Sequence, residues 1–379
     1  MLLMTTEIRP FRIEVPQAEL DDLHRRLAGA RFADPVPGDE PDWSRGMPAG
    51  AVRELAEYWR DGYDWRAHEA ALNAFPQFTT VLDGQKIHFL HLRSPQADAM
   101  PLLLTHGYPS SIAEFLDVLG PLTEPGADAF HVVVPSLPGF GFSTPLSGPG
   151  WELARTTEAF AELMTRLGYD RFAAQGGDIG AGVTGRLAAL YPERVIGTHV
   201  NSDRGTIALA GEQLPMPENL SEAEQSELDA AREAWRAGRG YLDLQSHQPE
   251  TIAAGLTDSP VAQLAWIAEK FQAWTNPEGG VGRDRLLTNV SLYWFTRSGA
   301  TAARFLYEAA HSAHGWLAPS DVPAGWAVFN TSPVVRRIMD PEEKIAHWSE
   351  FAQGGHFAAM EEPGLLVADV RAFFRGLRA

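Results

Sequence analysis

Gln175-Gly176-Gly177-Asp178-Ile179-Gly180 decides the fold of this 379-residue chain. An apolar run at 172–174 precedes it, and a helix-like segment at 181–191 follows it. A strand that enters a helix through a tight Gly-rich turn is the setting in which an enzyme presents a nucleophile on a strained elbow. The residue at the tip is Asp178, whose carboxylate can attack an alkyl carbon and form an ester, although it cannot act as a serine esterase does. Gly-rich turns that contain Asp are common, so other parts of the chain must support this interpretation.

Strand-like and helix-like segments alternate on both sides of the turn, which predicts an α/β fold with a mostly parallel sheet and helices on both faces. A hairpin with an Asp-Gly turn comes first, and the pattern from about residue 211 to 315 is helical only. An all-helical insertion between two strands is typical of a lid over the carboxyl ends of the strands. The expected strands are 78–82, 87–92, 102–105, 130–135, 172–174, 195–200, 326–329 and 348–351, with helices at 112–119, 153–167, 181–191 and 365–377.

The first 75 residues do not fit a parallel sheet. We expect a short strand at 11–15 that Pro16 ends, a crossing rich in Pro, Gly and Asp at 31–50, and helices at 18–27, 51–59 and 65–72. This pattern indicates an N-terminal helical meander without a catalytic role. The predicted division is therefore a meander with the first hairpin at 1–95, a first core part at 96–210, a helical lid at 211–315 and a second core part at 316–379.

Composition excludes several classes of function. The formal net charge of -18 argues against nucleic acid and anionic membrane surfaces as partners. With 0 Cys, the chain has no disulfide, no thiolate metal site and no Cys nucleophile. Residues 1–8 lack the basic region of a signal peptide, and no apolar run reaches the roughly 18 residues that a membrane span needs. We therefore expect a soluble, cytoplasmic protein.

Two further motifs supply partners for Asp178. His356 follows the last expected strand within a Gly-Gly turn, where a fold of this chain order places its general base. His106-Gly107-Tyr108-Pro109 follows the strand at 102–105, and the loop after such a strand supplies a donor to an oxyanion. The backbone N–H groups of Tyr108 and Ile179 are the expected oxyanion-hole donors.

These motifs resemble the epoxide hydrolases of the α/β-hydrolase fold, in the microsomal-type branch that carries an N-terminal meander. The resemblance covers nearly the whole chain. It includes Tyr63-Asp64-Trp65-Arg66, Phe75-Pro76-Gln77-Phe78, Asn289-Val290-Ser291-Leu292-Tyr293-Trp294 and His356-Phe357-Ala358-Ala359. The family activates its epoxide oxygen with two lid tyrosines, which implies Tyr241 and Tyr307 here. The spacing from Tyr293-Trp294 puts Leu306 at the usual place, one residue before Tyr307.

The chain departs from the family at the third member of the catalytic triad. The family places an acid directly after the strand at 326–329, where this chain has Asn330-Thr331-Ser332-Pro333. Asp340 lies further along the same connection, and Asp203 follows the strand at 195–200, a position that related Asp-nucleophile hydrolases use. Either carboxylate could accept a hydrogen bond from His356, and we favour Asp203.

The resemblance implies an enzyme that opens an epoxide by forming an ester on Asp178 and releases a vicinal diol when His356 activates water. It requires no metal and no organic cofactor. One alternative is a haloalkane dehalogenase, although those enzymes carry Trp after the nucleophile and this chain has Ile179. Another is a lidded binding protein that has lost turnover. We also expect a bulky, aryl-bearing epoxide as the substrate and a homodimer as the oligomeric state. The aromatic lid residues that suggest such a substrate are Trp235, Trp266, Phe271, Trp274 and Trp294.

Overall fold

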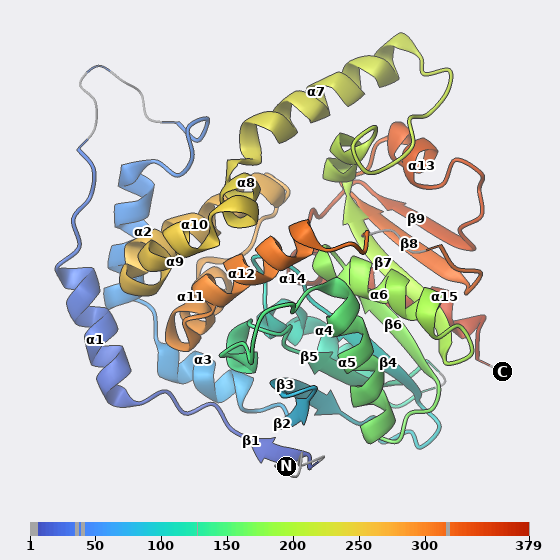
Figure 1. The fold of residues 1–379 in the computed structure, drawn as a ribbon, viewed down its shortest axis with the longest axis horizontal. Helices are drawn as coiled ribbons and strands as arrows, with labels where there is room; N and C mark the ends of the chain where they lie inside the picture. Colours follow the sequence, from blue (N-terminus) through green and yellow to red (C-terminus); the bar gives the residue numbers. More distant parts are fainter. Residues whose placement is uncertain (1–6, 35–37, 39–41, 127, 316–318, 379) are drawn as a thin grey trace.

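A nine-stranded sheet forms the centre of the protein, in the order β1-β2-β3-β5-β4-β6-β7-β8-β9 (Figure 1). The computed structural model describes residues 7–34, 38, 42–126, 128–315 and 319–378, so most of the stretch used to predict the absence of a signal peptide, and part of the 31–50 crossing, lie outside it. The strands are β1 (Arg9–Phe11), β2 (Gln77–Leu82), β3 (Gln85–Leu92), β4 (Met100–Thr105), β5 (Phe130–Pro135), β6 (Phe172–Gly176), β7 (Val195–Asp203), β8 (Ala324–Phe329) and β9 (His347–Phe351).

The sheet is antiparallel from β1 to the β3–β5 pair and parallel from β5 to β9. The β2–β3 hairpin turns at Asp83-Gly84, and both residues have positive φ, as the Asp-Gly signal predicts. Helices α5 (Leu153–Arg166) and α6 (Ile179–Leu190) pack together, and α4 (Leu116–Thr123) packs on the closing helix α15 (Pro363–Arg375). The predicted mostly parallel α/β architecture is confirmed.

Six helices between β7 and β8 form the lid, which lies above the sheet in Figure 1 in yellow and orange. The predicted helical insertion is therefore present. It packs internally through α12 against α8 and α9, and α7 projects from the body (Figure 1). The lid helices are α7 (Glu222–Gly238), α8 (Gly240–His247), α9 (Pro249–Asp258), α10 (Pro260–Trp274), α11 (Arg283–Thr296) and α12 (Ser298–His311).

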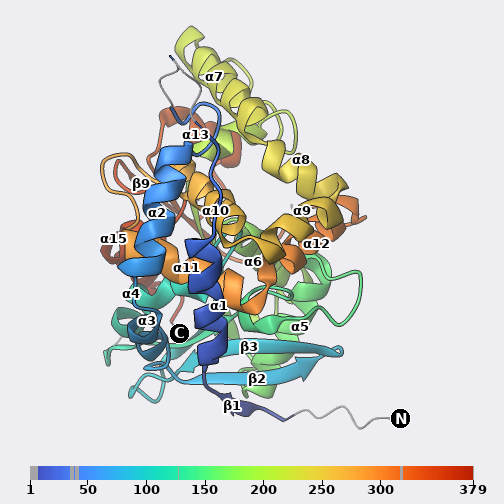
Figure 2. The same cartoon turned by 90° about the vertical axis from the view of Figure 1, so that its left-hand side faces the viewer.

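The N-terminal meander packs against the lid as well as the sheet (Figure 2). It contains α1 (Gln17–Ala28), α2 (Ala49–Asp61) and α3 (Trp65–Leu72). Trp59 Nε1 donates to Ser291 Oγ on α11 at 2.9 Å, and the Tyr63 hydroxyl lies 3.0 Å from Thr288 Oγ1. Both pairs are buried, so the meander closes the outer side of α11 with satisfied polar contacts.

The strand expected at 11–15 ends early, at Phe11. Beyond it, α3 replaces a neighbouring strand. Asn73 accepts from Ile13 N and donates to Ile13 O, and Glu69 accepts from Val15 N at 2.7 Å. Alternation of apolar residues cannot distinguish this arrangement from a sheet, because Ile13 and Val15 are buried in either case.

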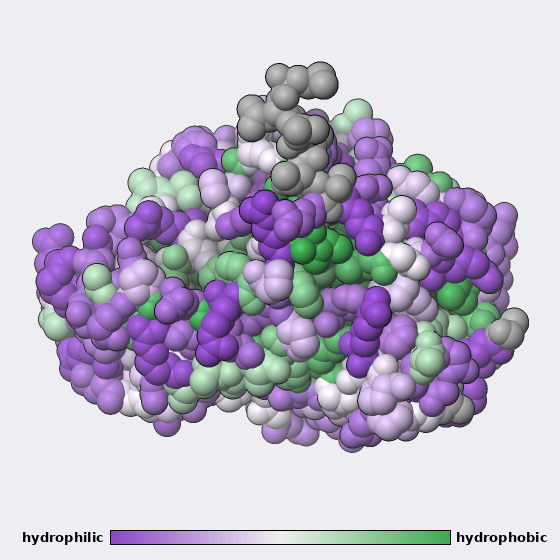
Figure 3. Space-filling model, turned by 90° about the horizontal axis from the view of Figure 1, so that it is seen from below, coloured by the Kyte–Doolittle hydropathy of each residue, from purple (hydrophilic) through white to green (hydrophobic). Residues whose placement is uncertain are grey.

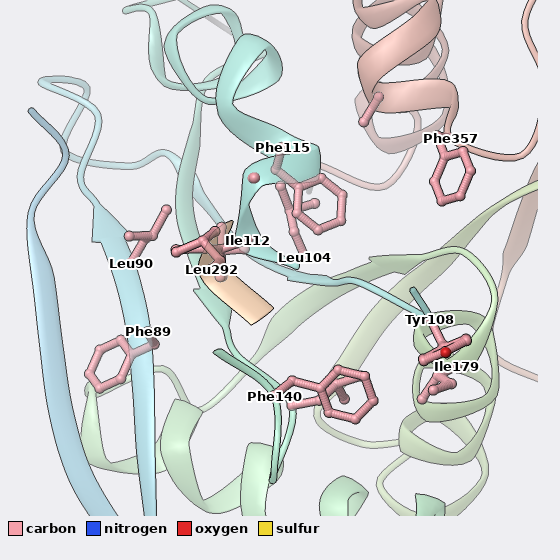
Figure 4. Close-up of a cluster of buried hydrophobic side chains, with 14 of the residues drawn as sticks. Phe89, Leu90, Leu104, Tyr108, Ile112, Phe115, Phe140, Ile179, Leu292 and Phe357 are labelled. Atoms are coloured by element: carbon pink, nitrogen blue, oxygen red, sulfur yellow. The ribbon is translucent and has the colours of Figure 1, made fainter. Parts of the chain in front are cut away.

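One hydrophobic core runs from the sheet into the lid. In Figure 4, Leu292 of α11 lies beside Leu90 and Leu104 of the sheet, while Tyr108 and Ile179 lie together near the elbow. On the face shown in Figure 3, hydrophilic residues dominate and hydrophobic ones form smaller groups. Within the described part of the chain, no helix is long and apolar enough to cross a membrane.

We expect Trp59→Phe to lower the free energy of unfolding by about 1–3 kcal/mol, because it leaves the buried Ser291 hydroxyl without its donor. Chemical denaturation with urea measures this change. Tyr58→Phe is the matched control, since Tyr58 also reaches α11, through Asp284, but from an exposed position. We expect that control to leave the midpoint unchanged. Equal effects of the two substitutions would contradict a special role for the buried pair.

Candidate active site

The turn between β6 and α6 holds Asp178 at φ 53° and ψ -125°. Few residues with a side chain adopt this backbone conformation, and it persists only where the surroundings impose it. Close backbone packing does so here: a Cβ on Gly180 would lie 1.9 Å from the Thr105 carbonyl oxygen. A Cβ on Gly107 would lie 2.4 Å from Asp178 Oδ1. Glycine is therefore required on both sides of the carboxylate.

The structure brings Asp178, His356 and Asp203 together. His356 Nδ1 lies 2.8 Å from Asp203 Oδ2, and His356 Nε2 lies 3.6 Å from Asp178 Oδ2. Asp203 ends β7, and His356 lies between β9 and α14 (Ala358–Glu361). Of the two acids left open by the sequence, Asp203 is the one beside the imidazole. The carboxylate of Asp340 instead accepts from the backbone N–H groups of Lys344 and Ile345.

His356 lies between two carboxylates in a buried environment. Burial by itself lowers the pKa of His356, but the hydrogen bond with Asp203 and the negative charges around the ring outweigh it and raise the pKa to about 9. The imidazole is therefore protonated at neutral pH. Its Nδ1 donates to Asp203, whereas its Nε2 forms a longer ion pair with the Asp178 carboxylate. It can act as a base only after one of these charges is removed.

A backbone N–H donates to the same carboxylate. Tyr108 N donates to Asp178 Oδ1 at 2.8 Å. Ile179 is the first residue of α6, and the N–H groups of a first helical turn have no partner within the helix. Both predicted oxyanion-hole residues therefore flank Asp178, where they could stabilise negative charge on an ester carbonyl.

Tyr241, on α8, is a lid phenol near this constellation. Its ring is parallel to that of Tyr108, with centroids 6.1 Å apart, and it meets the edge of Trp274 at 5.4 Å. Lys270 Nζ lies 4.3 Å from the centre of the Tyr241 ring. Burial, followed by the charge of Asp178, raises the pKa of Tyr241 well above its ordinary value. The phenol therefore keeps the proton that a donor needs.

Tyr307, the other predicted donor, has different surroundings. It is half-buried on α12, and its ring stacks on His311 with centroids 4.2 Å apart. Among the described residues, no hydrogen bond or ring contact joins Tyr307 to Asp178, His356 or Tyr241. The structure therefore does not bring Tyr307 into the constellation.

Glu114 belongs to the site and was missed by the sequence analysis. It is 5% exposed and, together with Asp178 and His356, lines a narrow hollow that has no room for a water molecule. Burial raises the pKa of Glu114 to about 7. The available signal was an acid inside the apolar helix-like segment that follows His106-Gly107-Tyr108-Pro109. The hollow is lined by Gly107, Tyr108, Ser110, Glu114, Gly177, Asp178, His356 and Phe357.

Three of the five aromatic lid residues surround the site. Trp266 Nε1 donates to the Tyr108 hydroxyl at 2.6 Å, Trp274 lies 4.9 Å from the His356 ring, and Phe271 stacks on Phe357 at 4.1 Å. The other two do not take part: Trp235 reaches Glu212, and Trp294 lies under Arg26. A larger surface hollow, of about 360 Å³, lies between residues 12–17 and α3 and contains none of the predicted catalytic residues.

Comparisons with known proteins agree with this geometry. Residues 8–115 match the epoxide hydrolase N terminus family, and residues 100–208 match the alpha/beta hydrolase fold family. A protein of Stigmatella aurantiaca, named provisionally as an epoxide hydrolase, is 46% identical over 98% of this chain and 86% of its own length. Epoxide hydrolase 1 of Sus scrofa is 34% identical over 97% of this chain and 88% of its own length.

Solved structures give the same result. The epoxide hydrolase of Aspergillus niger superposes with a TM-score of 0.84 at 32% identity, covering 98% of this chain and 97% of that one. The juvenile hormone epoxide hydrolase of Bombyx mori has a TM-score of 0.83 at 30% identity, covering 99% of this chain and 95% of that one. The chain therefore belongs to the epoxide hydrolases of the α/β-hydrolase fold that carry the epoxide hydrolase N-terminal region.

Proposed function

We propose that this protein hydrolyses an epoxide to a vicinal diol through a covalent ester on Asp178. The observation that carries the proposal is the position of His356 between Asp203 and Asp178, 2.8 Å from one carboxylate and 3.6 Å from the other. A nucleophilic carboxylate needs a base for the second step, and an imidazole beside it can activate water for attack on the ester. The family relationship supports the same reaction.

In the first step, Asp178 attacks an epoxide carbon, and the electron pair of the broken C–O bond passes to oxygen. That oxygen takes a proton, with Tyr241 as donor from the lid. Asp178 thereby becomes a neutral ester, so His356 loses one of the negative charges that hold its pKa high. The proton that the ring then releases replaces the one that Tyr241 gave to the substrate oxygen, so the phenol is restored.

In the second step, neutral His356 takes a proton from water, and the oxygen of that water attacks the ester carbonyl. The N–H groups of Tyr108 and Ile179 stabilise the oxyanion. Collapse of the tetrahedral intermediate passes the remaining proton to the departing alkoxide and restores the Asp178 carboxylate beside protonated His356.

The alternative functions have less support. A haloalkane dehalogenase shares the ester intermediate, but this chain has Ile179 where those enzymes carry Trp. A binding protein without turnover was suggested by the absent acid after β8. Asp203 lies 2.8 Å from the imidazole, so the absent acid after β8 no longer favours a binding protein. The homodimer and the cytoplasmic location stay predictions from the sequence.

We expect His356→Gln to accumulate the ester after incubation with styrene oxide, because the second step has lost its base. Intact-protein mass should rise by one substrate mass, and peptide sequencing should locate the adduct on Asp178. Asp178→Asn in the same background is the control and should gain no mass. Diol formation by the parent enzyme without an adduct in His356→Gln would show that Asp178 is not the nucleophile.

Asp203→Asn should slow ester hydrolysis roughly 10²–10⁴-fold, because the carboxylate orients and charges the base. The ester should then become visible by mass during turnover. Asp340→Asn is the matched substitution at the other acid and should turn over at the parent rate. The assignment is wrong if Asp340→Asn accumulates ester and Asp203→Asn does not.

An aryl-bearing substrate is the finer part of the proposal, and it rests on Trp266, Phe271 and Trp274 around the site. The hollow beside Asp178 has no room for a water molecule, so an aryl group has to displace some of the side chains around it. We expect styrene oxide to have a higher kcat/KM than propylene oxide, since stacking adds binding energy. A preference for propylene oxide in a direct competition assay would refute the aryl substrate and leave the reaction type intact.

A further inference from the structure

We propose that the hydroxyl of Tyr108 is the second phenol that donates to the epoxide oxygen, and that Tyr307 does not serve this role. The inference rests on the proposed function, because it assigns a donor for the first step. Tyr108 then has two separate duties. Its backbone N–H contacts the nucleophile, and its side chain contacts the leaving oxygen.

The surroundings of Tyr307 leave it without access to the reacting atoms. Its ring stacks on His311, one turn further along α12, and its carbonyl oxygen is bound by the same imidazole. Leu306 takes the preceding position and is buried in the core. Side chains at adjacent positions of a helix point in directions about 100° apart, so a tyrosine one residue late faces elsewhere.

The oxygen of the Tyr108 hydroxyl accepts a hydrogen bond, while its proton is available for donation to a substrate. Trp266 Nε1 donates to this oxygen at 2.6 Å. An indole N–H can only donate, so the phenol proton is not used in that contact. A donated hydrogen bond also makes the phenol a stronger donor through its own O–H. The ring is buried, which raises the pKa of Tyr108 and keeps this proton in place.

Tyr108 and Tyr241 form a matched pair of phenols above the elbow. Their rings are inclined by only 3° with centroids 6.1 Å apart. Each phenol has the charge of Asp178 among the causes that raise its pKa, so both lie within electrostatic reach of the nucleophile. Two parallel phenols can share one alkoxide, and each donor needs no rearrangement at the moment of reaction.

Gln245 provides an independent sign that this part of the lid faces a polar ligand. It lies one turn after Tyr241 on α8, and its amide lies beside the Tyr108 hydroxyl without closing a well-formed hydrogen bond. The side chain is fully buried, yet neither its Oε1 nor its Nε2 has a partner in the protein. Buried amides are normally satisfied, so these atoms fit a site that a polar group enters during catalysis.

The decisive experiment measures the first step alone. In the His356→Gln background, the rate of adduct formation on Asp178 is measured with styrene oxide and with phenacyl bromide. Attack on phenacyl bromide breaks a C–Br bond and releases bromide, which needs no proton. We expect Tyr108→Phe to slow the reaction with styrene oxide roughly 10–1,000-fold, while the labelling by phenacyl bromide stays unchanged.

Three further substitutions complete the design. Tyr241→Phe should behave as Tyr108→Phe does, Tyr307→Phe should react at the parental rate, and Tyr191→Phe, at the end of α6, controls for loss of a hydroxyl elsewhere. The inference is overturned if Tyr108→Phe reacts normally, if it slows both reagents equally, or if Tyr307→Phe is the slow variant. If the parental background forms no adduct with any epoxide, the proposed function itself fails.

Discussion

The strained turn at Asp178 is the constraint on which the rest of the site depends. A side chain at φ 53° and ψ -125° costs of order 1–3 kcal/mol, so the surrounding structure has to offset it. β6 does so from the middle of the sheet, where β4 and β7 hold it on both sides. Gly180 lets the first turn of α6 lie against the end of β4. As a result, the nucleophile, the loop after β4 and the end of β7 meet at one edge of the sheet.

The second constraint is electrostatic. Two carboxylates and one imidazole share a partly buried space, and a charge that is partly removed from water is costly unless it is paired. Protonated His356 forms ion pairs with both Asp178 and Asp203. Forming the ester removes one negative charge and thereby converts the cation into a base. The base is therefore released only when an ester is present for the activated water to attack.

Much of the site was readable from the sequence because its signals are local. The elbow, the loop at Tyr108 and the Gly-Gly turn at His356 each come directly after a strand, and the end of a strand fixes the position of the next residues. Three features depended on tertiary distances. The choice between Asp203 and Asp340, the orientation of Tyr307 and the burial of Glu114 are set by which segments pack together. The shortened β1 has the same origin, since side chains of α3 replace a strand that alternation alone had indicated.

The family motif places the triad acid directly after β8, whereas this chain supplies it from the end of β7. The geometry of the sheet allows this change of position. β7 and β8 are parallel neighbours, and Asp203 is in register with Phe329, so the last residues of the two strands are level. A carboxylate at the end of β7 thus starts about 4.8 Å, one strand spacing, from the place directly after β8. His356 can be reached from either strand. The two positions differ in the contacts that hold the acid in place. Asp203 also accepts a hydrogen bond from Gly205 N, and it caps the start of the short helix Arg204–Leu209, which leads into the lid. The orientation of the base is therefore fixed by the segment at which the lid begins.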